Sequence, residues 1–235
     1  MTLLRRGLLC LVLLLPTPWY LLWADGYTPD IREFEAEQSL QFAGNPAFAL
    51  QGAVEFWLAT AWTDDPGYDP VVLFAGRQDQ VVYALAVLAD RSGLSLQSGS
   101  QVAEVAVDLA DDQLHHVVLT RLDDGVALMV DGRVRGSFDL SVSDAEIQVL
   151  HIASGPSGDF SFPGALGGLR FWDVPIDAET VQAYVLEDVM HPEWPHPDLE
   201  SLLAYSDFSN GAVELTQAPH AEDYEQVEYQ EVGSE

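Results

Sequence analysis

Residues 114–138 read LHHVVLTRLDDGVALMVDGRVRGSF, and this stretch decides the fold. Three short runs rich in aliphatic and β-branched residues are separated by Asp123-Asp124-Gly125 and by Asp131-Gly132. An Asp-Gly pair between alternating apolar residues is a strong hairpin signal, because the tight turn needs residues that accept a positive φ. The stretch therefore predicts a three-stranded antiparallel meander.

Similar β-prone runs lie on both sides of this meander. In residues 53–59, Val54, Phe56 and Leu58 would share one face, with Glu55 and Trp57 on the other. Frequent Gly, Pro and Asp residues separate the runs and predict turns. The runs with this pattern are residues 39–45, 53–59, 71–75, 81–88, 94–97, 102–107, 147–153, 167–172 and 202–205.

One helix is expected, over residues 177–185. Asp177 is placed to be its N-cap, and Val181, Tyr184 and Val185 would form its buried stripe. Many short strands with one helix predict an all-β fold, a two-sheet antiparallel sandwich.

Composition restricts the classes of function. The chain has 235 residues, of which 48% are hydrophobic, so one domain can bury a large core. Its formal net charge of −29 disfavours nucleic-acid binding, because phosphates would be repelled. The acidic surface is either a solvated face or a docking surface for cations and basic partners. The single cysteine, Cys10, leaves the mature domain without a disulfide.

The N-terminal segment resembles an export signal. Arg5 and Arg6 precede an almost wholly apolar run over residues 7–24. The run is either a signal peptide cleaved after Ala24 or an uncleaved membrane anchor. Both alternatives predict an extracytoplasmic protein that meets the membrane only through this segment.

The rest of the chain is expected to form a single domain. Residues 25–37 look like a polar lead-in, residues 38–207 like the domain, and residues 208–216 like its end. Residues 217–235 hold six acidic residues and little apolar content, which predicts a disordered acidic tail.

Several motifs together resemble the laminin-G-like jelly-roll family of the concanavalin A-like lectin/glucanase superfamily. The matching stretches are LQFAGN (residues 40–45), VEFWL (54–58), LHHVV (114–118), VDG (130–132), the strand 164–172 and the helix 177–185. The resemblance covers about residues 38–207. It gives a structural role to Asn45, Glu55, Trp57, His115, His116, Asp131, Gly132, Arg170 and Trp172.

The resemblance implies a jelly roll of two curved sheets. Members are usually non-catalytic and bind glycans, matrix proteins or cell-surface proteins, often beside a rim calcium. Two departures stand out: Leu114 replaces a usual tryptophan, and Gly167-Gly168 replaces a usual Asp-Glu pair.

Catalysis is not predicted. Glycoside hydrolysis needs two carboxylates across the sugar, and superfamily glucanases place them on one strand as Glu-x-Asp-x-x-Glu, a spacing absent here. Glu33, Glu35 and Glu37 alternate without completing that motif, so they are interpreted as the solvated face of a leading strand. A divergent glycoside hydrolase stays as an alternative.

Calcium is the one cofactor that the sequence leaves open. Hard cations need several oxygen ligands, and Asp64, Asp65 and Asp69 lie in one loop, with Asp159 in another. Ordinary solvated acidic loops are the alternative. His115 and His116 are adjacent, so on a strand they face opposite sides and cannot share a metal ion.

Aromatic residues offer a candidate surface for stacking on sugars. Trp57, Trp62, Tyr68, Tyr83 and Trp172 are candidates, although core packing is the alternative for each. Trp62 and Tyr68, beside the acidic loop, are the expected exposed pair. The sequence thus predicts an exported, non-catalytic module that binds a glycan or a protein partner through its rim loops, with a membrane-tethered envelope protein as alternative.

Overall fold

The computed structural model describes residues 30–77, 80–141, 146–184, 196–206 and 208, together with the backbone of residues 212–215 and 225–232. The expected signal peptide or anchor, residues 1–24, lies outside these ranges. Within them, no helix has the length and apolar character needed to cross a bilayer.

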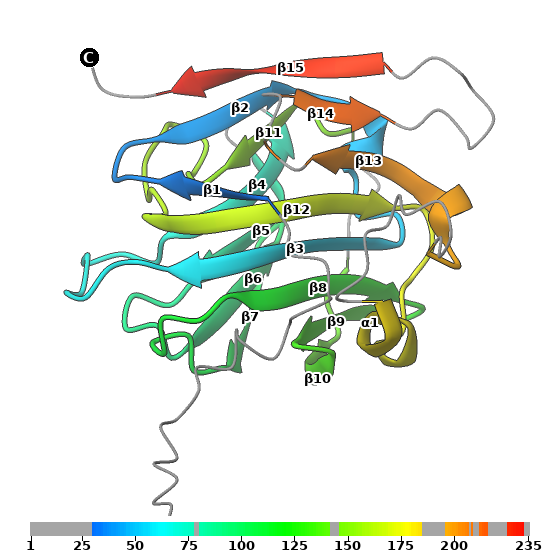
Figure 1. Ribbon diagram of the computed structural model, residues 1–235, viewed down its shortest axis with the longest axis horizontal. Helices are drawn as coiled ribbons and strands as arrows, with labels where there is room; N and C mark the ends of the chain where they lie inside the picture. Colours follow the sequence, from blue (N-terminus) through cyan, green and yellow to red (C-terminus); the bar gives the residue numbers. More distant parts are fainter. Residues whose placement is uncertain are drawn as a thin grey trace, which may run out of the picture.

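Two antiparallel sheets stack face to face and confirm the predicted sandwich (Figure 1). Sheet A has the order β10 (Arg133–Phe138), β9 (Gly125–Val130), β8 (His115–Leu122), β3 (Ala53–Thr60), β12 (Gly164–Trp172), β13 (Leu202–Ser206) and β14 (Ala212–Leu215). Sheet B has the order β2 (Ser39–Ala43), β11 (Val149–Ile152), β4 (Val71–Arg77), β5 (Gln80–Val87), β6 (Gly93–Ser98) and β7 (Gln101–Ala106).

The predicted meander is confirmed as β8, β9 and β10. Its second turn has φ of +53° at Asp131 and +68° at Gly132. Two consecutive positive φ angles are what a tight two-residue hairpin turn demands, and the Asp-Gly pair supplies them. The turn therefore fixes the register in which Val130 pairs with Arg133.

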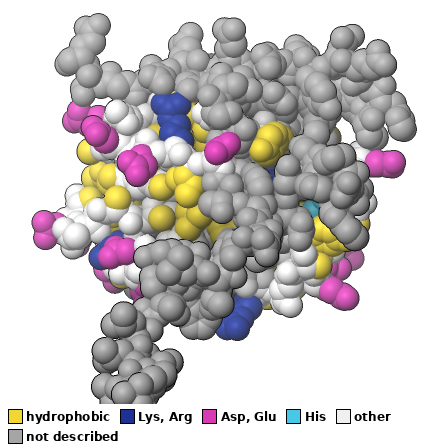
Figure 2. Space-filling model, in the orientation of Figure 1, with side chains coloured by type: hydrophobic (Ala, Val, Ile, Leu, Met, Phe, Trp, Pro, Cys, Tyr) yellow, Lys and Arg dark blue, Asp and Glu magenta, His cyan; other side chains and the backbone are white. Residues whose placement is uncertain are grey.

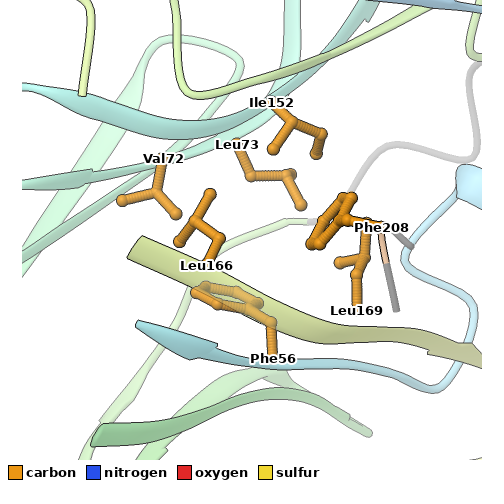
Figure 3. Close-up of a pocket in the computed structure, with 7 residues that line it drawn as sticks. All are labelled: Phe56, Val72, Leu73, Ile152, Leu166, Leu169 and Phe208. Atoms are coloured by element: carbon orange, nitrogen blue, oxygen red, sulfur yellow. The ribbon is translucent and has the colours of Figure 1, made fainter. Parts of the chain in front are cut away.

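The core lies between the sheets, and alternation along each strand decides which side chains enter it. Val54, Phe56 and Leu58 of β3 face inward, as predicted. Figure 3 shows apolar side chains from both sheets converging, and the void between them measures only about 10 Å³. A void this small and apolar has room for little more than one water and offers it no polar partner. This part of the interior therefore holds no ligand site.

A second apolar cluster covers the outer face of sheet A. Helix α1 (Ala178–Tyr184) begins after Asp177, whose Oδ1 accepts the Thr180 N–H at 2.8 Å, so the predicted N-cap is confirmed. Val181 of the helix packs with Val118 and Met129 of the sheet. The helix thus protects apolar side chains that the sandwich interior cannot hold.

The lead-in contains a strand where a leading strand was expected near Glu33, whereas the tail differs from expectation. Residues 31–34 of the lead-in form β1 (Ile31–Phe34), which pairs with the first half of β12. Residues 225–232 of the expected disordered tail form β15 (Glu225–Val232). β15 pairs with β14 over its first half and with β2 over its second half. Composition missed β15 because its stability comes from distant partners and not from local apolar content.

The glycine pair that departs from the family pattern forms a β-bulge. The register of β12 against β3 shifts between Gly167 and Arg170, and Gly168 has a φ of +57°. A Cβ at Gly167 would clash with the carbonyl oxygen of Asp30. The pair therefore allows β1 to approach β12 closely, a role that Asp-Glu could fill only with strain.

Candidate functional site

The rim of interest is the end of the sandwich where β3 ends and β8 and β12 begin, at the left of Figure 1. We call it the rim site; it comprises loop residues 61–70, 88–92, 107–112 and 153–163 together with Arg135 of β10. Backbone hydrogen bonds join these loops, from Ala61 N–H to Pro163 O at 3.2 Å and from Val71 N–H to Phe160 O at 2.8 Å. The loops therefore form one braced surface.

Trp62 is not part of the exposed surface, contrary to expectation. Its side chain is only 9% exposed and packs edge-on against Phe162, with ring centroids 5.7 Å apart. Its Nε1–H donates to the carbonyl oxygen of Ala89 at 2.9 Å. A tryptophan this buried usually finds a partner for its N–H, and here that bond anchors loop 61–70 to loop 88–92.

Tyr68 does reach the surface, beside an aromatic residue that sequence reasoning missed. Phe160 is 47% exposed, and its ring meets that of half-buried Tyr68 at 5.7 Å in an edge-to-face arrangement. The Tyr68 hydroxyl lies 3.2 Å from Ser161 Oγ and 3.3 Å from Ser161 O. We call the Tyr68 and Phe160 rings the aromatic step; loop 61–70 carries the first ring and loop 153–163 the second.

The backbone at Phe160 adopts a conformation that bulky residues rarely take. Its φ is +52°, in the left-handed region, and Ala153 in the same loop has a φ of +64°. Hydrogen bonds from Gly155 N–H to Asp159 O and from Phe162 N–H to Ala153 O hold the loop in this form. Such strain persists only where surrounding contacts impose it, and it concentrates at functional sites. No local sequence signal marks it.

The four aspartates proposed as calcium ligands do not converge. Asp65 Oδ1 accepts the Gly67 N–H at 2.7 Å, and Asp69 Oδ1 accepts the Ala89 N–H at 2.9 Å. Asp64 and Asp159 are exposed. Among the described side chains, no group of three His, Cys, Asp or Glu residues is placed to hold a metal. These residues therefore do not fit a calcium ion.

A shallow depression of about 370 Å³ lies between loops 88–92 and 107–112 and Arg135 of β10. Arg91 and Arg135 line it, together with Asp90 and Asp108. The bond between Asp69 and Ala89 connects it to the loop that carries Tyr68. Sequence reasoning missed it because its arginines are 44 positions apart, although their rarity in so acidic a chain was a usable signal.

The two halves of the rim site have complementary chemistry. An exposed aromatic step can pack against the apolar face of a ring-shaped ligand. Arginine and aspartate side chains can donate to and accept from neighbouring hydroxyl groups. A larger depression of about 480 Å³ at the opposite end is lined by Gln51, Arg121, Leu122, Asp123 and Pro175, none of them aromatic.

A buried ionic network lies on the outer face of sheet A, away from the rim site. Arg170 Nη1 donates to Glu55 Oε1 at 2.7 Å, and His116 Nε2 lies 3.4 Å from Glu55 Oε2. Burial raises the pKa of Glu55, but Arg170 and His116 outweigh it and lower the pKa to about 2. Trp57 packs on the His116 ring at 4.9 Å. This network gives the expected motif residues a structural role.

The remaining motif residues shape turns. Asn45 Oδ1 accepts the Ala47 N–H at 2.9 Å and caps the short helix over Pro46–Phe48. Asp131 Oδ1 accepts the His116 N–H at 3.0 Å, and Asp131 Oδ2 lies 2.9 Å from His115 Nδ1. The two histidines point to different partners, as the alternation predicted.

A laminin G family model, described as the concanavalin A-like lectin/glucanases superfamily, matches residues 35–182. The chain belongs to this superfamily. A comparison with curated protein sequences found no match.

Solved structures with the same fold are distant in sequence. A Bacteroides ovatus protein proposed to bind carbohydrate is 13% identical, with a TM-score of 0.60 over 87% of this chain and 58% of its own length. The CBM40 of a Ruminococcus gnavus sialidase, bound to α2,3-sialyllactose, is 13% identical, with a TM-score of 0.52 over 67% of this chain and 96% of its own. A heptameric pentraxin of Limulus polyphemus is 12% identical, with a TM-score of 0.50 over 89% and 93%. At these sequence identities, the similarity between this chain and the three solved structures shows a shared fold alone.

Proposed function

We propose that this chain is an exported, non-catalytic module that binds a glycan at the rim site. The observation that carries the proposal is the aromatic step: Phe160 is held out to solvent by a strained, hydrogen-bonded loop, against Tyr68. An aromatic side chain held at the surface at such conformational cost is the kind of strained feature that concentrates at functional sites. The depression with Arg91 and Arg135 would hold the ligand's hydroxyl groups.

The printed descriptions of two structural neighbours support this class of ligand. One is a protein proposed to bind carbohydrate, and the other is a CBM40 bound to α2,3-sialyllactose. The absence of Glu-x-Asp-x-x-Glu from the chain supports binding without hydrolysis. Export is supported by the apolar run that follows Arg5 and Arg6.

The charge of the chain favours a neutral glycan over a polyanionic one. The formal net charge is −29, and Figure 2 shows acidic side chains around the margin of the face in view. A polyanionic glycan would meet repulsion from most directions. Neutral oligosaccharides of β-glucan, xylan, mannan or N-acetylglucosamine type are therefore the expected ligands.

A glycan array of these neutral oligosaccharides tests the proposal. Phe160→Ala and Tyr68→Ala should each weaken binding by about 30-fold, because truncation of an anchoring aromatic side chain costs about 2 kcal/mol. Tyr68→Phe retains the ring and should bind nearly as well as the parent chain. Leu122→Ala is the matched control, since Leu122 is 42% exposed at the opposite end of β8.

Two outcomes would overturn the proposal. If the parent chain bound no oligosaccharide on the array, glycan binding would be contradicted. If both alanine variants bound as well as the parent chain, the rim site would not be where the glycan binds. N-terminal sequencing of the protein from its host tests export separately. A chain that starts at Asp25 supports a cleaved signal, whereas a retained Met1 favours a membrane tether.

A further inference from the structure

His115 is held between two carboxylates that come from different parts of the rim. Its Nε2 lies 3.0 Å from Asp111 Oδ1, and its Nδ1 lies 2.9 Å from Asp131 Oδ2. Asp111 belongs to the loop that follows β7, and Asp131 belongs to the turn between β9 and β10. The imidazole ring therefore ties a rim loop to the central meander.

Both contacts can be hydrogen bonds only when the ring carries two protons. A neutral imidazole has one N–H, so its other nitrogen would face a carboxylate with a lone pair. The charged groups that face the ring are Asp111 and Asp131; the β3 neighbour of His115 is Leu58, and His116 points away toward Glu55. Burial lowers the pKa of His115, but its bonds to Asp131 and Asp111 outweigh burial and raise it overall.

The two carboxylates would respond differently to loss of a proton. Asp131 is fixed independently, because its Oδ1 accepts the His116 N–H and its own N–H donates to His116 O at 2.9 Å. A neutral ring would therefore keep its proton on Nδ1, toward Asp131. Asp111 would then face an unprotonated Nε2, and its remaining bond is from the Gln113 N–H at 3.0 Å.

The loop that Asp111 belongs to forms one wall of the depression in the rim site. Asp108 and Ala110 line the depression from this wall, and Arg91 and Arg135 line it from other elements. The nearer part of the loop is held by Leu109 N–H to Arg91 O at 3.0 Å. Beyond Leu109, Ala110 N–H donates to Asp108 Oδ1 at 3.0 Å within the loop, and the wall is tied to other elements by the His115 contact and by Arg91 Nη1 to Asp112 Oδ1 at 3.6 Å.

We propose that His115 is a proton-operated clamp on the rim site, which holds the wall over residues 110–112 in place when doubly protonated and releases it when neutral. The clamp makes ligand binding stronger in acid than in alkaline solution. This inference rests on the proposed function, because the ligand whose binding it regulates is the glycan at the rim site.

The clamp itself can be tested without any ligand. The ring carbon and proton signals of His115 should titrate at a pH above 6.5 in NMR spectra of the full chain. The amide signals of residues 110–113 should shift with the same midpoint. Asp111→Asn should lower that midpoint and remove the coupled shifts, whereas Asp124→Asn, in the turn between β8 and β9, should leave both unchanged.

The regulation is tested by the same neutral glycan array at pH 5.5 and at pH 9. The parent chain should bind about five-fold more tightly at pH 5.5, the lower end of typical coupling between sites. Asp111→Asn and His115→Gln should each bind equally at the two pH values. Asp111→Asn retains the bond to Asp131, so it remains informative if His115→Gln fails to fold.

The outcomes separate the clamp from the proposed function. A His115 titration midpoint at or below pH 6.5 would overturn the clamp, and so would amide signals of residues 110–113 that do not shift with that midpoint. Neither result would contradict glycan binding. Binding that is independent of pH in the parent chain would overturn the regulation. Absence of binding at both pH values would overturn the proposed function and the regulation with it, although the ring titration would still establish the clamp.

Discussion

His115 and His116 are neighbours on β8, yet they belong to two regions that use ionic contacts differently. His116 faces Glu55 and Trp57 on the covered outer face of sheet A, where the Glu55 side chain is 4% exposed. His115 lies at the rim, between Asp111 and Asp131, whose side chains are 33% and 44% exposed. Burial makes the first network a fixed structural element, whereas access to solvent leaves the second responsive to pH.

The largest effect is expected from the buried network. Glu55→Gln removes the carboxylate that accepts from Arg170 Nη1 at 2.7 Å, so the buried guanidinium loses this ion pair. The free energy of unfolding should fall by about 3–5 kcal/mol. Urea denaturation followed by tryptophan fluorescence measures this change.

Two further variants sharpen that measurement. Glu33→Gln changes an exposed carboxylate on β1 and should alter stability by less than about 0.5 kcal/mol. Replacing both partners, by Glu55→Leu with Arg170→Met, should recover much of the loss, since it removes the buried carboxylate and the buried guanidinium together. If Glu55→Gln alone proved as stable as the parent chain, the network would not be the structural element described here.

A smaller, pH-dependent effect is expected at His115. Its pKa is raised in the folded chain above the ordinary 6.5. Its contribution to stability is therefore complete below about pH 6.5 and is lost as the pH rises through the folded value. Denaturation curves from pH 5 to pH 9 should show stability falling across that window.

His115→Gln provides the comparison for the pH series. The variant lacks the titrating ring, so its stability should be lower than that of the parent chain in acid and nearly level over the same window. A parent chain whose stability instead rose through this range would contradict the assignment.

The smallest effect is expected at an ion pair whose carboxylate is almost fully exposed. Arg91 Nη1 lies 3.6 Å from Asp112 Oδ1, and the Asp112 side chain is 86% exposed. Asp112→Asn should cost less than about 1 kcal/mol, because solvent and salt screen such pairs. Repeating the measurement at high salt should remove the difference. A larger, salt-resistant cost would show that this pair belongs with the buried network.

The two histidines also illustrate which structural features can be predicted from the sequence. Alternation of apolar residues located β3 and its inward face, and Asp131-Gly132 located the hairpin turn, because both are local consequences of backbone geometry. The same alternation placed His115 and His116 on opposite sides. It could not reveal that His115 meets two carboxylates, since Asp111 and Asp131 reach it only after β7 and the meander are in place.

The rim site was the least predictable part for the same reason. Trp62 and Tyr68 are aromatic residues only six positions apart in the sequence. Contact with Phe162 buries Trp62, whereas Tyr68 stays partly exposed at the surface. Phe160 carried no signal because its exposure depends on a backbone conformation that hydrogen bonds within loop 153–163 impose. The fold can be predicted from local patterns that recur along the chain, whereas the candidate site depends on individual tertiary contacts that no local pattern encodes.

One consequence of β15 concerns solubility. This strand borders both β14 and β2, so a single C-terminal segment closes the open corner between the two sheets (Figure 1). A chain that ended before Glu225 would present two adjacent rows of unsatisfied N–H and C=O groups. Other chains could add to such rows as strands, and self-association could then propagate from molecule to molecule. By pairing with both edges, β15 thus prevents the exposed edges of β14 and β2 from promoting aggregation.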